Sequence, residues 1–204
     1  MNQQSFHLIR QPSVTRITLN RELDRQFDKL RQRGGGVVLD VGAKYAPYQE
    51  HLGADTYMTL DVDAACKPDI CCDLHDVDWP AASFDTIIAT EVLEHLYDPQ
   101  RAVDEMHRLL KPGGVCLLST RFLYPYHADP QDYYRFTQDA LAHLFRAFSH
   151  VAIRPHGNRL QAVWQLIESS KRTLGLLSWL NPLVARINRK KTKCPLGFVV
   201  WAER

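Results

Sequence analysis

VVLDVG, residues 37–42, is the stretch from which the fold can be predicted. Four of the five residues before Gly42 are apolar, a pattern typical of a short strand buried on both faces in a parallel sheet. A glycine directly after such a strand allows a sharp turn and the close approach of a ligand. Asp40 is therefore expected near the carboxyl end of the first strand, where open α/β sheets bind their ligands.

Further strands and helices alternate on both sides of this stretch. Leu19, Leu23, Phe27 and Leu30 recur at helical spacing within residues 18–33, and Gly34–Gly36 are expected to end that helix. Other helices are predicted after Asp98, up to a stop at 111–114, and after Thr137. The alternation predicts an α/β, Rossmann-like, doubly wound sheet. Its seven strands are expected at 37–42, 56–60, 69–72, 84–89, 115–119, 151–153 and 196–202.

Length and composition restrict the class of protein. A chain of 204 residues suits one domain, and a net charge of +2 gives no overall field for recruiting nucleic acid. Five cysteines without framework spacing indicate a reducing compartment, and no signal peptide or membrane-spanning segment is predicted. We expect a cytoplasmic, soluble protein with a single domain over 1–204, comprising a leader (1–36), a core (37–157), a helical insertion (158–194) and a last strand (195–204).

Each of the first four predicted strands ends in an acid. Together these acids favour a ligand with several hydroxyl or amino donors. Asp61 follows Asp40 by 21 positions, close to the ~20-residue offset of the ribose-binding acid in dinucleotide folds. Helix capping is the alternative role for Asp61, and more so for Asp73.

The residues after Gly42 distinguish between nucleoside ligands. A pyrophosphate of NAD or FAD requires G-x-G-x-x-G, but here Gly42 is followed by AKYAP, without the second and third glycines. S-adenosylmethionine (SAM) has no phosphate, and its hydroxyl, amine, ammonium and sulfonium groups favour acids at the strand ends. The residues therefore favour SAM over a nicotinamide cofactor.

Two blocks resemble a known family. VVLDVGAKYAPY (37–48) is similar to the first motif of class I SAM-dependent methyltransferases of the small-molecule, type 11 kind. FDTIIATEVLEHLYDPQRAVDEMHRLLKPGGVCLLST (84–120) resembles the block of the same family that spans the fourth strand, a helix and the fifth strand. The resemblance covers about residues 35–155 and implies that the last strand is antiparallel.

The resemblance also implies a cofactor site. Asp40 and Gly42 would flank the methionine part of SAM, and Asp61 would hold the ribose hydroxyls. The remaining implied contacts are the adenine edge at Asp73 and Leu74, and the closing residues Thr90 and Glu91. The family's usual glycines are replaced at Lys44 and Ala46, so a non-catalytic SAM-binding or partner-binding module is the main alternative, and a nicotinamide-dependent oxidoreductase is the second.

The loop TRFLYPYHADPQDYYRFT, residues 120–137, is expected to lie over the same edge as the ligand. His127 is the predicted catalytic base, with a structural histidine as the alternative, and His95 is expected to be structural. Predicted acceptor contacts are Tyr126, His127, Asp132, Tyr134 and Arg135. Asp132 and Arg135 are also candidates for a pair that only holds the loop, and we favour that role for Arg135.

The loop resembles a methyltransferase branch associated with bacterial cell-surface sugar pathways. The predicted function is O- or N-methylation of a small-molecule acceptor, a class that includes sugar- and lipid-linked compounds. No metal is expected: Cys66, Cys71, Cys72 and His75 lack the spacing of a zinc site, so the cysteines are interpreted as core thiols. Nucleic-acid methylation is disfavoured because the basic residues are scattered or confined to the tail.

The helical insertion is the least conventional part of the chain. A helical stripe is predicted from Leu160, Val163, Trp164 and Ile167. A crowded apolar stretch that includes Leu174, Leu176 and Trp179 leads into a basic cluster: Arg186, Arg189, Lys190, Lys191 and Lys193. A cap packed on the sheet is the favoured interpretation, and peripheral membrane contact through 174–193 is the alternative.

Overall fold

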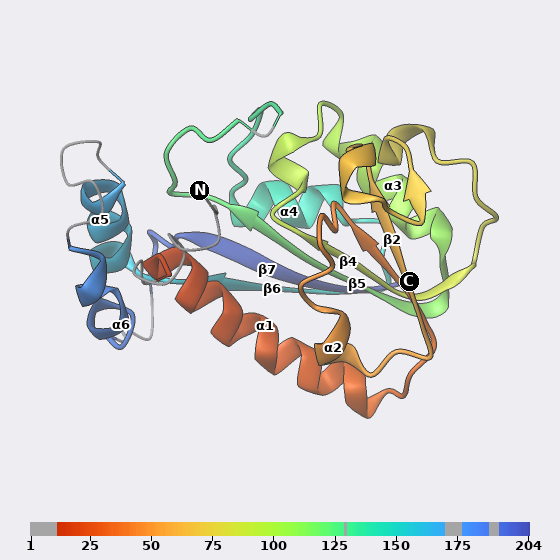
Figure 1. The fold of residues 1–204 in the computed structure, drawn as a ribbon, viewed down its shortest axis with the longest axis horizontal. Helices are drawn as coiled ribbons and strands as arrows, with labels where there is room; N and C mark the ends of the chain where they lie inside the picture. The colour runs from red at the N-terminus through yellow and green to blue at the C-terminus, as the bar shows by residue number, and fades with distance from the viewer. Residues whose placement is uncertain (1–11, 129, 170–176, 188–191) are drawn as a thin grey trace, which may run out of the picture.

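A seven-stranded sheet forms the centre of the computed structural model, which describes residues 12–128, 130–169, 177–187 and 192–204. The strand order is β3-β2-β1-β4-β5-β7-β6, and helices cover both faces (Figure 1). The strands are β1 (Val37–Val41), β2 (Thr56–Asp61), β3 (Ile70–Cys71), β4 (Phe84–Thr90), β5 (Leu110–Arg121), β6 (His150–His156) and β7 (Gly197–Glu203).

The strand directions confirm the predicted fold. β1, β2, β3, β4 and β5 run parallel, and β7 is antiparallel to both β5 and β6. In the centre of the sheet Asp40 is in register with Thr59 on β2 and Ile88 on β4. The carboxyl ends of β1, β2 and β4 therefore meet at one edge, as a doubly wound sheet requires.

Two hydrophobic clusters hold the helices against the sheet. On one face α1 (Val14–Gln32) buries the predicted stripe of Leu19, Leu23, Phe27 and Leu30 together with α2 (Gln49–Leu52). The opposite face is covered by α3 (Pro99–Leu109) and α4 (Gln138–Leu144). Three single-turn helices lie in the loops: η2 (Ala64–Cys66), η3 (Leu74–Asp76) and η4 (Leu93–His95).

Helix starts follow their caps. α1 begins earlier than predicted because the Ser13 side chain accepts a hydrogen bond from the Arg16 amide and caps its first turn. Asp98 and Thr137 cap α3 and α4 as predicted.

Three details of the sheet differ from the prediction. The predicted break between helix and strand at 111–114 is absent. Instead, β5 starts at Leu110, which pairs with Phe84, and the strand continues through 111–114 past a register shift. β3 is shorter than predicted, and β6 is longer. The interpretation of the clustered cysteines as core thiols is wrong: Cys71 is exposed, Cys66 and Cys72 are half-buried, and only Cys116 of the five is buried.

A helical elaboration stands between β6 and β7. It consists of α5 (Arg159–Glu168), η5 (Ser178–Leu180) and α6 (Asn181–Val184), at the end of the molecule where α1 begins (Figure 1). Among the described residues, no helix is both long and apolar enough to cross a membrane. The predictions for Leu174, Leu176, Arg189, Lys190 and Lys191 lie outside the described residues.

Candidate functional site

The turn after β1 has left-handed backbone at every second residue. The φ angles are 65° at Gly42, 46° at Lys44 and 49° at Ala46. At Gly42 a Cβ atom would lie 2.5 Å from Cγ2 of Val92, so only glycine fits. Lys44 and Ala46 keep the conformation that glycine prefers at a cost of about 1–2 kcal/mol each. The loop shape therefore survives the loss of the two glycines.

Asp61 connects this turn to the end of β2. The side chain is buried, and its two oxygens accept hydrogen bonds from the amides of Lys44 and Asp63, each at 3.0 Å. A carboxylate offers about four lone-pair sites, so Asp61 retains capacity for two ligand hydroxyls. Asp61 therefore lies at the carboxyl edge, and its role as the ribose-binding acid stays a prediction.

Asp40 lies deeper than Asp61. It is 1% exposed and accepts a hydrogen bond of 2.6 Å from the Tyr57 hydroxyl. Burial, and secondarily the charge of Asp61, raises the pKa of Asp40 to about 7, against the opposing effect of the Tyr57 hydrogen bond.

Asp73 and Leu74 stand at the predicted adenine edge. Asp73 caps η3 by accepting a hydrogen bond from the His75 amide at 2.9 Å, and it lies 2.6 Å from Nδ1 of the same residue. The other ring nitrogen of His75 is 2.9 Å from the Asp98 carbonyl oxygen. Leu74 is buried. Asp73 therefore has the capping role that the sequence left open as its alternative.

The chain bends sharply where β4 ends at Thr90. Glu91 has a φ of 59°, and its amide donates to the Ser119 carbonyl at 2.9 Å. Its side chain forms an ion pair with Arg121, whose guanidinium lies 3.9 Å from the ring centroid of Tyr124. A strained non-glycine residue at a ligand-binding edge is typical of a functional site.

Glu94 is the most deeply buried acid of this edge. It is fully shielded from solvent, and one oxygen accepts a hydrogen bond of 2.7 Å from the Thr120 hydroxyl. Burial and the neighbouring charge of Glu91 raise the pKa of Glu94 to about 8. The other oxygen, Oε1, has no hydrogen bond and lies 3.9 Å from Nε2 of His127, which also has none.

The loop that carries His127 is fastened to η4. The carbonyl of Glu94 accepts from the Tyr133 amide at 2.9 Å, and a His95 ring nitrogen contacts the Gln131 carbonyl. His95 thus holds the loop, as expected. Asp132 accepts from the His127 amide at 2.8 Å and lies 3.2 Å from its Nδ1, which orients the ring toward Glu94.

The predicted acceptor residues divide into two groups. Arg135 donates to Asp132 at 2.6 Å and to the carbonyls of Tyr124 and Pro125, so this pair holds the loop, in the role favoured from the sequence. The pair lowers the pKa of Asp132. Tyr134 donates to the Tyr97 carbonyl. Tyr126 is 77% exposed and lies apart from this network.

Sequence reasoning missed Glu94 and Arg121. Glu94 belongs to the second family-like block (84–120), in which no role was predicted for it, and Arg121 directly follows the apolar fifth strand. The sequence did carry a signal for this group: the cation Arg121 follows the fifth predicted strand, and the two acids Glu91 and Glu94 follow the fourth.

Glu94, His95 and His127 also have the composition of a cation site. Each offers one ligand atom, and these atoms lie within 4.8 Å of one another, the only such group in the described ranges of the chain. Carboxylate and imidazole ligands suit several divalent metals. The expectation that no metal is needed stays a prediction.

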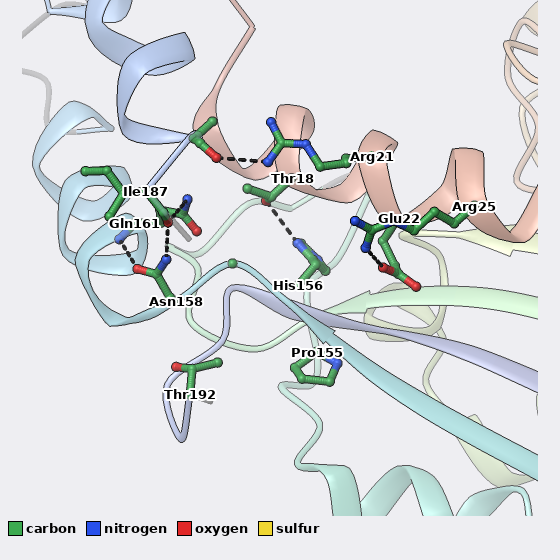
Figure 2. Close-up of a pocket in the computed structure, with 12 residues that line it drawn as sticks. Thr18, Arg21, Glu22, Arg25, Pro155, His156, Asn158, Gln161, Ile187 and Thr192 are labelled. Atoms are coloured by element: carbon green, nitrogen blue, oxygen red, sulfur yellow. Dashed lines mark hydrogen bonds and ion pairs between the residues drawn. The ribbon is translucent and has the colours of Figure 1, made fainter. Parts of the chain in front are cut away.

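A separate cavity of about 190 Å³ lies between α1, the end of β6 and the helical elaboration (Figure 2). Its polar lining includes Arg21, Glu22, His156 and Gln161. His156 is buried, and its Nδ1 is 3.2 Å from the Thr18 hydroxyl. Burial lowers the pKa of His156 to about 3, so this histidine is neutral. No residue of the predicted site lines the cavity.

Comparison with known proteins gives a family match for residues 34–118, to the family described as a methyltransferase domain. Among curated relatives, a ubiquinone biosynthesis O-methyltransferase of Coxiella burnetii is 42% identical over 83 residues, covering 41% of this chain and 30% of that protein. One of Pseudomonas paraeruginosa is 29% identical over 111 residues, covering 46% and 48%. The chain thus spans less than half the length of these relatives.

Solved structures share the fold. A SAM-dependent methyltransferase from Archaeoglobus fulgidus matches with a TM-score of 0.58 at 15% identity, covering 89% of this chain and 94% of that one. A Burkholderia thailandensis 1,6-didemethyltoxoflavin-N1-methyltransferase matches with a TM-score of 0.58 at 18% identity, covering 89% and 77%. The family match agrees with the resemblance seen in the two sequence blocks, and these structures show that the fold is shared.

Replacing Ala46 by glycine should stabilise the protein. Relief of left-handed strain of about 1–2 kcal/mol exceeds the extra backbone entropy of glycine, so we expect a gain of roughly 0.5–1 kcal/mol. Urea denaturation measures it. Ala65→Gly, on the short helix η2, is the control and should lose stability. A loss in Ala46→Gly would contradict the strain.

The pH dependence of stability tests the buried acid. With its pKa raised from 4.5 to about 8, folded Glu94 holds a proton that the unfolded chain releases, so stability falls as pH rises between these values. Glu94→Gln should therefore gain stability relative to wild type from about pH 5 to pH 8, then level off. For Asp40→Asn the gain should level off nearer pH 7, because the pKa of Asp40 is about 7. Urea denaturation at several pH values measures the free energy of unfolding of wild type and variants. A difference between them that does not change with pH would contradict the raised pKa values.

Proposed function

We propose, from the match of residues 34–118 to the methyltransferase domain family and from the fold, that this chain transfers a methyl group from SAM to a hydroxyl of a small-molecule acceptor. The observation that carries the proposal is the pair of buried atoms, Glu94 Oε1 and His127 Nε2, that face each other at 3.9 Å without hydrogen bonds. The pair lies beside the carboxyl edge of the sheet.

The carboxyl edge fits SAM. Gly42 gives the turn its left-handed backbone in close contact with Val92, which places the loop after β1 at the carboxyl edge. Asp61 retains acceptor sites for ribose hydroxyls, and Glu91 brings a negative charge to the end of β4. When bound, SAM supplies a methyl group on a sulfonium that already leaves well.

Glu94 and His127 provide a place for the proton that a hydroxyl acceptor loses. When the acceptor oxygen takes the methyl group, the bond between that methyl and the sulfonium sulfur would break, S-adenosylhomocysteine would leave, and the hydroxyl proton would pass to the unprotonated ring nitrogen of His127 beside Glu94. Burial and the charge of Arg121 lower the pKa of His127, so its ring is neutral near pH 7 and has an unprotonated nitrogen. Asp132 holds the ring in place, which aligns the base with the acceptor.

A small hydroxyl compound is the acceptor class that these features support. The matched relatives are named O-methyltransferases of ubiquinone biosynthesis, and five tyrosines with exposed rings surround the edge: Tyr45, Tyr97, Tyr126, Tyr133 and Tyr134. Such rings pack against sugar or phenol rings and leave their hydroxyls for hydrogen bonds. We extend the proposal to sugar- or lipid-linked forms of such a compound.

Binding of SAM is the first prediction of the proposal. Calorimetric titration should give a micromolar Kd for SAM and S-adenosylhomocysteine. Asp61→Ala should weaken it about tenfold or more, equivalent to about 1.4 kcal/mol, because the ribose hydroxyls lose their acceptor. Asp104→Ala, an exposed acid on α3, is the matched control and should bind as wild type does. A folded wild type that binds neither compound would exclude the SAM site.

Turnover is the second prediction. With SAM and a panel of phenols and sugars, S-adenosylhomocysteine should form faster than with alkylamines. His127→Asn should slow this by about 10²–10⁴-fold with nearly unchanged SAM affinity, because it removes the proton acceptor and not a cofactor contact. Asp104→Asn should retain wild-type turnover. SAM binding without turnover for the whole panel would favour the non-catalytic module.

A further inference from the structure

α5 is an amphipathic helix whose polar side, and not its apolar side, is buried against the protein. Its polar side chains are buried, with Gln161, Gln165 and Glu168 between 2% and 4% exposed. Its apolar side chains point outward, with Leu160 at 43% and Val163 at 50% exposed, and Leu166 and Ile167 are similar. A surface helix normally shows the opposite arrangement. The stripe predicted from the sequence therefore exists, but most of it faces away from the sheet.

Polar contacts fix this orientation. Gln165 accepts hydrogen bonds from the amide and hydroxyl of Thr15 at 3.2 and 2.8 Å, so α5 is attached to the start of α1. Figure 2 shows Asn158 and Gln161 directed at the carbonyl of Ile187, with donor distances of 2.7 and 3.2 Å. Rotating α5 to bury its apolar side would break these buried hydrogen bonds, each of which is costly to leave unmade.

The exposed apolar side chains continue onto the neighbouring helices. Trp179 on η5 is 64% exposed, Leu183 on α6 is 54% exposed, and Ile187 is 42% exposed. We call these side chains with those of α5 the outer face: Leu160, Val163, Leu166, Ile167, Trp179, Leu183 and Ile187. Every other exposed large apolar side chain in the described part of the chain is a tyrosine or valine of the loops at the candidate site.

The charge of the chain is concentrated in the same segment. Residues 158–194 contain eight lysines and arginines and one acid, Glu168, which gives a net charge of +7. Because the whole chain carries +2, the remaining residues carry −5. Glu168 is buried, so the acidic side chain of this segment is turned away from the outer face.

From the exposed apolar side chains and this charge we infer that the outer face docks on the surface of an anionic lipid bilayer. Apolar side chains with a tryptophan among them enter the boundary between headgroups and acyl chains, and lysines and arginines beside them attract anionic headgroups. A second copy of the chain is a poorer occupant, because a symmetric dimer through this face would bring two segments of +7 together. The inference goes beyond the proposed chemistry and does not depend on it.

Vesicle binding tests the inference directly. The full chain should float with phosphatidylcholine vesicles that contain about 30% phosphatidylglycerol and should not float with pure phosphatidylcholine. Raising NaCl from about 0.1 M to about 1 M should weaken this, since the Debye length shrinks from about 10 to 3 Å. Val163→Ser with Leu166→Ser should reduce binding to the anionic vesicles about tenfold or more without a change of charge.

A second pair of variants separates the face from the net charge. Val163→Asp with Leu166→Asp should abolish flotation. Gln49→Asp with Gln138→Asp adds the same charge at exposed first-turn positions of α2 and α4. This pair should keep most of the flotation with anionic vesicles. Circular dichroism checks folding. Equal loss in both pairs, binding unaffected by the serine variant, or no binding by the wild type would overturn the inference. So would a wild-type dimer that the serine variant converts to a monomer.

Discussion

The contact between the ends of β1 and β4 positions both halves of the candidate site. Gly42 turns the chain against Val92 so closely that no other residue fits, and this contact brings the loop after β1 next to the loop after β4. Asp61 then holds the first loop through the Lys44 amide, while Ser119 and Arg121 hold Glu91 on the other side. The proposed cofactor edge and the Glu94–His127 pair share one small volume because these two loops are in contact.

The buried part of this edge holds two acids, Glu91 and Glu94, beside one cation, Arg121. Arg121 has one close acid, Glu91, and a more distant one, Glu94, whose nearer oxygen is 3.8 Å away. Two acids and one cation away from water cannot all be fully ionised at little cost, so the least solvated acid retains its proton most strongly. Burial, together with the charge of Glu91, therefore raises the pKa of Glu94 to about 8, although the hydrogen bond from Thr120 opposes the shift.

The sheet and the position of the acids at its carboxyl edge followed from the sequence because they depend on local patterns. Apolar runs ending in Asp40, Asp61 and Glu91 define strands and the edge where they stop, and the two family-like blocks confirm their order. Glu94 and the orientation of α5 did not follow, because both depend on which long-range partner a side chain meets. The periodicity of Leu160 and Val163 marks a helical side but does not say whether that side faces the core.

β7 separates β5 from β6 in the sheet although it follows both in sequence. β6 pairs only with β7, so it has no strand neighbour until residues 197–203 are in place. During synthesis on the ribosome, the parallel half of the sheet can form early, while β6 and the helices attached to it wait for this strand. Until then the free edge of β5 and the apolar side chains destined for it are exposed, which makes this interval the time when chaperones and aggregation compete for the chain.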